Sequence, residues 1–166
     1  MRLPRDVTGR ELAKSLAQLG YAIDRQTLME TFLFGRSSVV IGNLAPDDPP
    51  EFQAKKDQIV QYPYDPRRAT QTLQDMGLAK GPDGMFLDLD GTPAAVEIRT
   101  ITSDISNKTM LAVADYWKTV GVAATPFVIP PNLATDAQYR YSYGGYELVR
   151  NGADRNQFAR WISANN

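Results

Sequence analysis

The segment Thr102-Ser103-Asp104 brings two hydroxyl groups and a carboxylate together at a predicted junction between a strand and a helix. In open α/β sheets, ligands bind beyond the carboxyl ends of the strands, where the first N–H groups of the next helix are free to donate. These three residues are therefore the first candidates for contacting a polar ligand. The plainer interpretation is that Ser103, Asp104 or the nearby Ser106 only caps the helix.

A second group near the C-terminus is aromatic and cationic: Tyr139, Arg140, Tyr141, Tyr143, Tyr146 and Arg150. Aromatic rings interleaved with arginine can stack on nucleobases, but they suit a half-buried strand or the wall of a ligand cleft equally well. The chain has 18 Lys and Arg against 19 Asp and Glu, so it has no basic surplus with which to hold phosphates. The charge balance therefore argues against nucleic acid as a partner.

Several kinds of catalytic and metal site are excluded by composition, because the chain contains neither His nor Cys. Ser-His-Asp and Cys-His catalysis, disulfides and Cys-ligated zinc are all ruled out. The sequence Asp88-Leu89-Asp90-Gly91 resembles the start of a calcium loop, yet the twelfth position, which needs a bidentate Glu, is Arg99. Asp90-Gly91 instead predicts a hairpin turn. We predict that the protein is not an enzyme and has no metal site and no cofactor.

The overall composition predicts one packed domain, or one domain with an added segment. Of the 166 residues, 43% are apolar and 22% are charged, as in ordinary globular proteins. No apolar run reaches the roughly 18 residues that a membrane span needs. The first residues, MRLPRDVTGRELAK, lack the apolar centre of a signal peptide. We therefore expect no membrane insertion and no signal peptide in this chain.

Capping residues and glycines predict the helices that would position these side chains. The expected helices cover residues 8–20, 24–34, 66–76, 103–120 and 154–163. The first should end at a left-handed Gly20, and the third lies between the N-cap Asp65 and Gly77. Three sets of apolar residues should face inward: Ile23, Leu28, Phe32 and Leu33; Ala69, Leu73 and Met76; Met110, Leu111, Ala114, Trp117 and Val120. The third helix is expected to dock on the sheet.

Apolar runs between these helices predict strands over residues 85–89, 93–101, 122–129 and 145–150. The first two flank the Asp90-Gly91 turn and should form a hairpin. Residues 93–101, the following helix and residues 122–129 form a βαβ unit, which should be parallel and right-handed. The predicted fold class is α/β.

Several segments then resemble one known family. Residues 21–28 (YAIDRQTL), 33–36 (LFGR) and 62–69 (YPYDPRRA) are similar to motifs of the family 5 extracellular solute-binding proteins, the peptide and nickel receptors of ABC importers. The segments around Asp90-Gly91, from Ala112 to Val122 and over residues 145–150 (GYELVR) follow in the same order. The resemblance runs from about residue 21 to 160 and is most specific at Y-P-Y-D-P.

This resemblance implies a function and a site. It implies that residues 21–166 form a non-catalytic solute-binding lobe with a periplasmic-binding-protein-like fold. The whole protein would be periplasmic or extracellular, and it would deliver a peptide or similar small polar solute to an ABC permease. Family members are several times longer and have two lobes, so the chain is expected to be a fragment. The ligand face should combine Thr102, Ser103 and Asp104 with Tyr146, Arg150 and Asn151. Arg150 would hold a carboxylate and Asn151 a peptide backbone, unless Arg150 only pairs with Asp154.

The N-terminal residues suggest a different relationship. Residues 3–12 (LPRDVTGREL) with Leu19-Gly20-Tyr21 resemble the opening helix of HicA-type mRNA interferase toxins, whose catalytic His has no counterpart here. Residues 1–20 are an expected leader helix whose origin is left open between a fused segment and a chance similarity in a generic amphipathic helix. The alternatives to a solute-binding lobe are an RNA-binding or toxin-related module without the catalytic His, and a relic or chimera that keeps only the fold.

Overall fold

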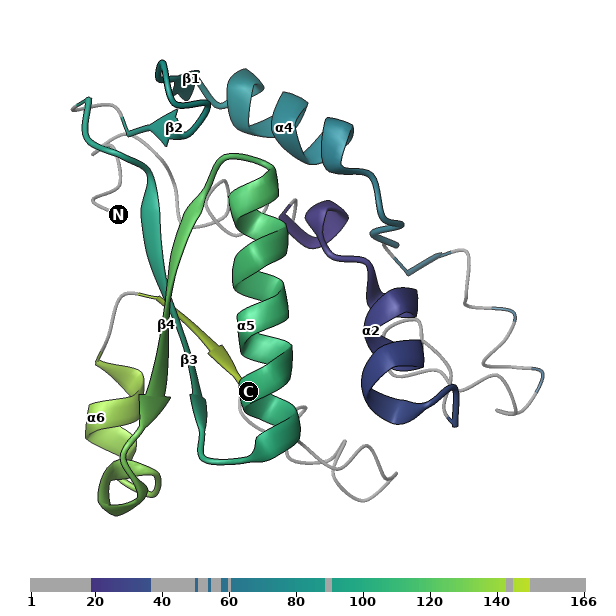
Figure 1. Ribbon diagram of the computed structural model, residues 1–166, viewed down its shortest axis with the longest axis vertical. Helices are drawn as coiled ribbons and strands as arrows, with labels where there is room; N and C mark the ends of the chain where they lie inside the picture. Colours follow the sequence, from purple (N-terminus) through teal and green to yellow (C-terminus); the bar gives the residue numbers. More distant parts are fainter. Residues whose placement is uncertain are drawn as a thin grey trace.

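The centre of the molecule is a three-stranded parallel sheet with the strand order β4-β3-β5 (Figure 1). The computed structural model describes residues 19–36, 50, 54, 58–59, 61–88, 91–142 and 145–149. The strands are β3 (Ala95–Ile101), β4 (Ala123–Ile129) and β5 (Gly145–Leu148). Helix α5 (Asp104–Thr119) connects β3 to β4 and packs on both. The predicted α/β class and the parallel βαβ unit are confirmed.

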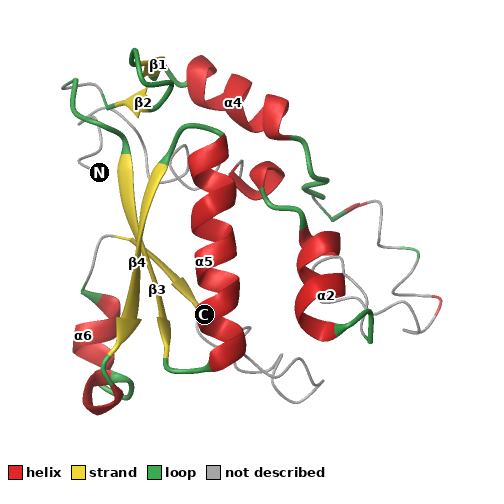
Figure 2. Ribbon diagram, in the orientation of Figure 1, coloured by secondary structure: helices red, strands yellow, loops and turns green. Residues whose placement is uncertain are grey.

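Smaller elements surround this unit. They are η1 (Leu19–Ala22), α2 (Arg25–Leu33), α4 (Pro66–Asp75), β1 (Ala79–Lys80), β2 (Phe86–Leu87), η3 (Pro131–Leu133) and α6 (Ala137–Tyr141). Figure 2 shows α5 between the sheet and α2, and both η1 and α2 contact α5. Among the described residues, no helix has the length and hydrophobicity of a membrane span. The predicted helix over residues 154–163 lies outside the described residues.

The two faces of the sheet carry different chemistry. Ile98 pairs with Tyr146 in the register of β3 and β5, and the Tyr146 ring contacts Trp117 of α5. Because side chains alternate along a strand, Arg99 and its partner Glu147 lie on the opposite face. Glu147 there contacts an arginine of α6. One face is therefore an apolar core under α5, and the other holds a charged cluster beside α6.

The predicted hairpin is present in a shortened form. Gly91 has a left-handed φ of 81°, and the Asp88 N–H donates to the Thr92 carbonyl at 2.6 Å. The only β pairing between the two arms among the described residues is the bridge between Leu87 and Pro93. β2 instead forms an antiparallel pair with β1.

Helix α4 begins and ends as predicted, but its buried side differs. The Asp65 carboxylate accepts the Arg68 N–H at 2.9 Å. Ala69 and Leu73 are buried, whereas Met76 is 41% exposed. The left-handed Gly77 turns the chain back so that the N–H of the buried Leu78 donates to the Leu73 carbonyl. Leu78 takes the buried place predicted for Met76, and α4 packs mainly against η1 instead of the sheet.

Helix α5 also differs from its prediction at one position. Met110, Val113, Ala114 and Trp117 are buried in the core, whereas Leu111 is 55% exposed. Leu111 lies at the border of the buried stripe, where it faces the groove beside β4. The helix begins at the N-cap Ser103, and Ser106 lies buried within it. The alternative prediction, in which Ser106 caps this helix, is therefore wrong.

The prediction of the buried side of α2 was right only in part, and the prediction of a left-handed Gly20 was wrong. No residue of α2 is buried, although Ile23 and Leu28 pack against the core. The predicted inward residues Phe32 and Leu33 are only half-buried. Gly20 lies inside η1 without a left-handed φ. A Cβ there would lie 3.1 Å from a Tyr62 ring carbon, so close packing is what requires glycine.

The two most specific motifs of the family resemblance contact each other. The guanidinium of Arg25, from YAIDRQTL, donates to the carbonyls of Gly20 at 2.9 Å and Tyr62 at 3.0 Å. Burial lowers the pKa of this Arg25 guanidinium from its ordinary value. The Asp65 N–H, from YPYDPRRA, donates to the Tyr21 carbonyl at 2.8 Å. Together these bonds hold η1 against the start of α4.

The outer edge of β4 is interrupted by a proline. Within the described residues, β4 pairs only with β3. The Ala123 N–H donates towards the β3 side, to the Ala94 carbonyl. Since backbone groups alternate along a strand, Ala124, Pro126 and Val128 present their backbone to the outer edge. Pro126 has no N–H, which is why it is tolerated at this edge.

Candidate functional site

The carboxyl ends of the three parallel strands define one edge of the sheet, at the lower end in Figure 1. The first turn of α5 follows β3 at this edge, and η3 and α6 follow β4. β5 is in register with β3, with Leu148 opposite Thr100, so Val149 leaves the sheet towards the same edge. In sheets of this type, this edge is where ligands bind.

The predicted residues Thr102, Ser103 and Asp104 lie at this edge in three different situations. Thr102 is exposed. Ser103 is the N-cap and accepts the Ser106 N–H at 3.5 Å. The exposed Asp104 forms an ion pair of 2.8 Å with Lys108. The capping interpretation is thus confirmed for Ser103, while Thr102 and Asp104 keep polar atoms accessible to solvent.

Tyr146 does not lie beside these residues. It pairs with Ile98, four positions before Thr102, which corresponds to about 13 Å along a strand. Its ring packs edge-to-face on Trp117 with the ring centroids 4.8 Å apart. Burial raises the pKa of Tyr146 to about 12. The structure therefore places Tyr146 under α5, away from the carboxyl edge.

Arg150 and Asn151, the other two predicted ligand residues, lie outside the described residues. So do Tyr143 and Asp154, the acid weighed as a partner of Arg150. Asn107 in the first helical turns of α5 was missed by sequence reasoning. Its side-chain oxygen Oδ1 is buried, and no hydrogen-bond partner is found for it among the described residues. A lone Asn inside a helix gives no sequence signal that distinguishes such an atom from an exposed one.

A charged cluster on the other face of the sheet was also missed. The Arg99 side chain is almost fully buried, and its Nε lies 3.8 Å from Glu147 Oε2. Arg140 of α6 pairs with the same carboxylate through Nε at 3.0 Å and through Nη2. Arg99 Nη2 donates to the carbonyls of Tyr139 at 3.2 Å and Arg140 at 2.8 Å. The one sequence feature that could have indicated this cluster was a lone arginine, Arg99, inside the apolar run of β3.

This cluster accounts for two of the aromatic and cationic residues, Tyr139 and Arg140. The Tyr139 ring lies 5.1 Å from the Arg99 guanidinium carbon, and Arg140 pairs with Glu147. These two side chains therefore have contacts within the protein itself. The cluster holds α6 to the sheet beside the carboxyl edge.

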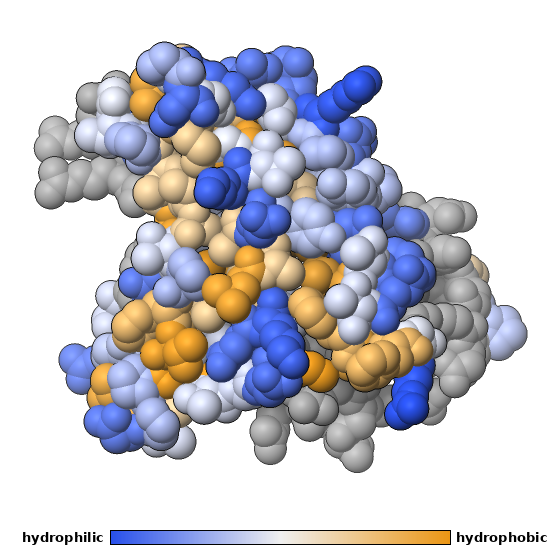
Figure 3. Space-filling view, in the orientation of Figure 1, coloured by the Kyte–Doolittle hydropathy of each residue, from blue (hydrophilic) through white to orange (hydrophobic). Residues whose placement is uncertain are grey.

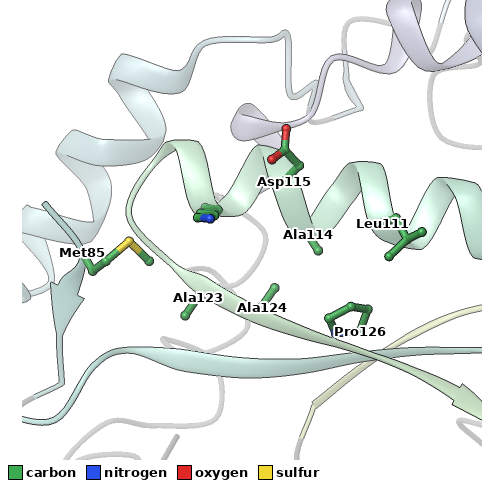
Figure 4. Close-up of a pocket in the computed structure, with 8 residues that line it drawn as sticks. Met85, Leu111, Ala114, Asp115, Ala123, Ala124 and Pro126 are labelled. Carbon is green, nitrogen blue, oxygen red and sulfur yellow. The ribbon is translucent and has the colours of Figure 1, made fainter. Parts of the chain in front are cut away.

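A groove of about 380 Å³ lies between α5 and β4 (Figure 4). It is lined by Leu111, Ala114, Asp115 and Lys118 from α5 and by Ala124 and Pro126 from β4. Figure 3 shows exposed apolar surface across the middle of this face. The groove is mainly apolar, with one carboxylate and one ammonium group in its lining. Within the described ranges, no three acidic side chains gather into a metal site.

A parallel sheet covered by one long helix, with polar groups at its carboxyl edge, is the architecture of a single lobe of a periplasmic-binding-protein-like fold. Residues 19–158 match the family described as bacterial extracellular solute-binding proteins, family 5 Middle. The chain belongs to this family. The resemblance found over residues 21–160 is confirmed, whereas the toxin resemblance of residues 3–21 has no support from these matches.

Individual relatives agree with this assignment. Heme-binding protein A of Haemophilus influenzae is 31% identical over 108 residues, which are 65% of this chain and 18% of that protein. The stachyose complex of the periplasmic binding protein MelB from Agrobacterium fabrum has a TM-score of 0.71 at 16% identity, over 86% of this chain and 22% of that one. NikZ from Campylobacter jejuni, in complex with Ni(L-His), has a TM-score of 0.61 at 22% identity, over 77% and 24%. The chain thus spans about a quarter or less of these relatives, and the two structures support its fold.

Proposed function

We propose that the chain contributes one lobe of a receptor that binds a small polar solute, such as a peptide, for an ABC importer. The observation that carries the proposal is the parallel carboxyl edge, where Thr102 and Asp104 remain exposed next to the start of α5. Family membership supports a solute-binding role. The lobe would cover residues 21–166, with residues 1–20 as a separate leader.

The proposed contacts follow from the chemistry of the side chains. Thr102 and Asp104 offer a hydroxyl and a carboxylate to the polar groups of the solute, while Ser103 holds the helix start. Arg150 would hold a carboxylate through its planar fork, and Asn151 would donate to and accept from a peptide group. Tyr146 packs on Trp117 under α5 and makes no contact with the solute in this proposal.

The same proposal includes the location of the receptor and its partner protein. A receptor of this kind acts in the periplasm or outside the cell and presents its loaded form to a membrane permease. It performs no chemistry on the solute, which agrees with a chain that lacks His and Cys. The related structures include complexes with a nonapeptide, Ni(L-His) and stachyose, so the fold itself does not select one solute.

The proposal can be tested by grafting the proposed site into a longer relative. The segments around residues 102–104 and 145–151 replace their counterparts in a two-lobed peptide receptor, and binding of trialanine is measured by calorimetry with and without Arg150→Ala. Loss of the carboxylate contact should weaken binding at least tenfold, because a charge-assisted bidentate pair is lost. Val149→Ala, at an exposed valine of the same grafted segment, is the matched control and should bind as the unmutated graft does.

Two results would contradict the proposal. Unchanged trialanine binding by the Arg150→Ala graft would remove Arg150 from the site. RNA binding by the original chain, with an affinity that falls steeply as salt is raised, would instead favour the toxin-related alternative.

A further inference from the structure

One side of α5 carries a regular row of exposed side chains, which we call the α5 stripe. Its members recur at alternating spacings of four and three residues, the repeat that keeps side chains on one side of a helix. They are Asp104, Lys108, Leu111, Asp115 and Lys118, and all five are exposed. The stripe therefore has one large apolar residue at its centre and two charges of opposite sign on each side of it.

The charges are ordered so that the α5 stripe complements itself. Asp104 and Lys118 each lie seven residues from Leu111, in opposite directions, and Lys108 and Asp115 lie three and four residues from it. If a second copy of α5 crossed in the opposite direction with its Leu111 on this Leu111, every carboxylate would face an ammonium group. Asp104 would face Lys118 of the second copy, and Lys108 would face its Asp115. A parallel copy in the same register would place like charges together.

The positions around the helix agree with the positions along it. An α-helix turns by about 100° per residue, so Lys108 and Asp115 lie on one side of the stripe and Leu111 and Lys118 on the other. Figure 4 shows the same division, with Leu111 directed towards β4 and Asp115 away from it. A two-fold axis across the stripe keeps each residue on its own side. Lys108 therefore meets Asp115 of the second copy, and the two Leu111 side chains meet beside the groove.

We propose that two copies of this chain associate through their α5 stripes, antiparallel and about a two-fold axis at Leu111. Such an interface is isologous, because both copies use the same surface. Its apolar centre is Leu111, which is 55% exposed, next to the groove with its small side chains Ala114 and Ala124. Surface ion pairs contribute little singly, but two kinds of pair, each formed twice, determine which orientation is favourable.

The first experiment is sedimentation equilibrium of the full chain over a range of concentrations, without any solute. The surface is small, so we expect a weak dimer that is half-dissociated at roughly 0.1 mM protein in low salt. Raising the salt to about 0.5 M should weaken the association about tenfold, since it screens exposed charges. A species of monomer mass at all concentrations up to about 1 mM would overturn the proposal, whatever else covers this side of α5 in a longer protein.

The second experiment tests the orientation with two charge reversals. Lys118→Glu places a carboxylate opposite Asp104 of the second copy, and Asp104→Lys places an ammonium group opposite Lys118. Each variant alone should associate at least tenfold more weakly than the original chain, because like charges then meet twice. An equimolar mixture of the two should associate about as well as the original chain. In the mixed dimer, the new carboxylate of one variant faces the new ammonium group of the other.

The controls separate this effect from unfolding and from net charge. Circular dichroism shows whether each variant is folded, and mixing could not reverse a loss of association that came from unfolding. Arg67→Glu makes the same change of charge as Lys118→Glu at an exposed residue of α4, and it should associate as the original chain does. Unchanged association of Lys118→Glu would overturn the proposal, and so would a mixture of folded variants that stays monomeric. Asp104 is also a proposed solute contact, but these measurements contain no solute and do not depend on that proposal.

Discussion

At the scale of single residues, short polar side chains determine where the helices begin. Asp24, Asp65 and Asp136 each accept the N–H three residues ahead at 2.9 Å. Ser103 makes the corresponding contact at the start of α5. These interactions use only neighbouring residues, which is why a reader of the sequence can locate them.

The cap of α4 provides the first prediction. Asp65→Ala should lower the free energy of unfolding by about 1 kcal/mol, because the Arg68 N–H loses its acceptor. Urea unfolding followed by circular dichroism measures this change. Asp75→Ala, on the last turn of the same helix, is the control and should have little effect. An unchanged urea midpoint for Asp65→Ala would contradict the capping role.

Tyr146 provides a prediction about alkaline pH. Its folded-state pKa is about 12, above the ordinary value of 10.0, because burial disfavours the charged phenolate. Between these two values the unfolded chain releases this proton more readily than the folded one, so stability should fall as pH rises from 10 to 12. Melting temperatures over this range should fall less steeply for Tyr146→Phe, whereas Tyr64→Phe should keep the original slope. Equal slopes in all three proteins would count against burial of this hydroxyl.

At the scale of elements, α6 shows how a very short helix can be held in place. It has five residues, which is too few for a stable isolated helix. Asp136 caps its first turn, and Arg99 from β3 donates to the carbonyls of Tyr139 and Arg140 at its end. A side chain from about forty residues earlier thus supplies the bonds that the end of the helix lacks.

Replacing Arg99 should therefore release α6 without unfolding α5. In Arg99→Lys the charge is kept, but the fork that reaches two carbonyls is lost. Hydrogen exchange followed by mass spectrometry should show residues 134–142 exchanging at least tenfold faster, with α5 unchanged. Lys108→Met, which removes an exposed ion pair of α5, is the control and should leave both segments as they are. Equal protection of α6 in Arg99→Lys would show that Arg99 does not hold it.

The elements predicted correctly from the sequence are those whose signals are local. α5, β3 and β4 were expected from Ser103, Gly121 and the apolar runs between them. α6 was not predicted, because its stability depends on Arg99, which is distant in the sequence. Met76 was misplaced because the turn at Gly77 changes which residue returns to the core. At the candidate site, Thr102, Ser103 and Asp104 were placed correctly at the edge of the sheet, but the inward direction of Tyr146 depends on Trp117.

At the scale of the whole molecule, the proposed function gives the chain one side of a binding site. Its described strands form one three-stranded parallel sheet and the small β1-β2 pair, and the chain covers 18% of its relative heme-binding protein A. A receptor that encloses its solute gains most of its affinity by burying nearly all of the ligand surface. One lobe alone leaves half of that surface in water.

Solute binding by the isolated chain should therefore be weak. We expect no detectable heat from short peptides such as trialanine in calorimetry at micromolar protein, because the contacts of one lobe do not offset the entropy lost on association. A two-lobed receptor measured under the same conditions is the positive control. Tight peptide binding by this chain alone would show that its site is complete and would contradict the single-lobe proposal.

Pro126 bears on whether copies of this chain stack edge to edge at high concentration. An open sheet edge can template the stacking of further copies, which is the usual start of fibrous aggregates. Pro126 removes the middle one of the three outward donors on β4, so an incoming strand cannot form a continuous ladder there. The neighbouring Phe127 and Val128, which are 37% and 39% exposed, would otherwise favour such growth. We therefore expect Pro126 to oppose the stacking of further copies at this edge.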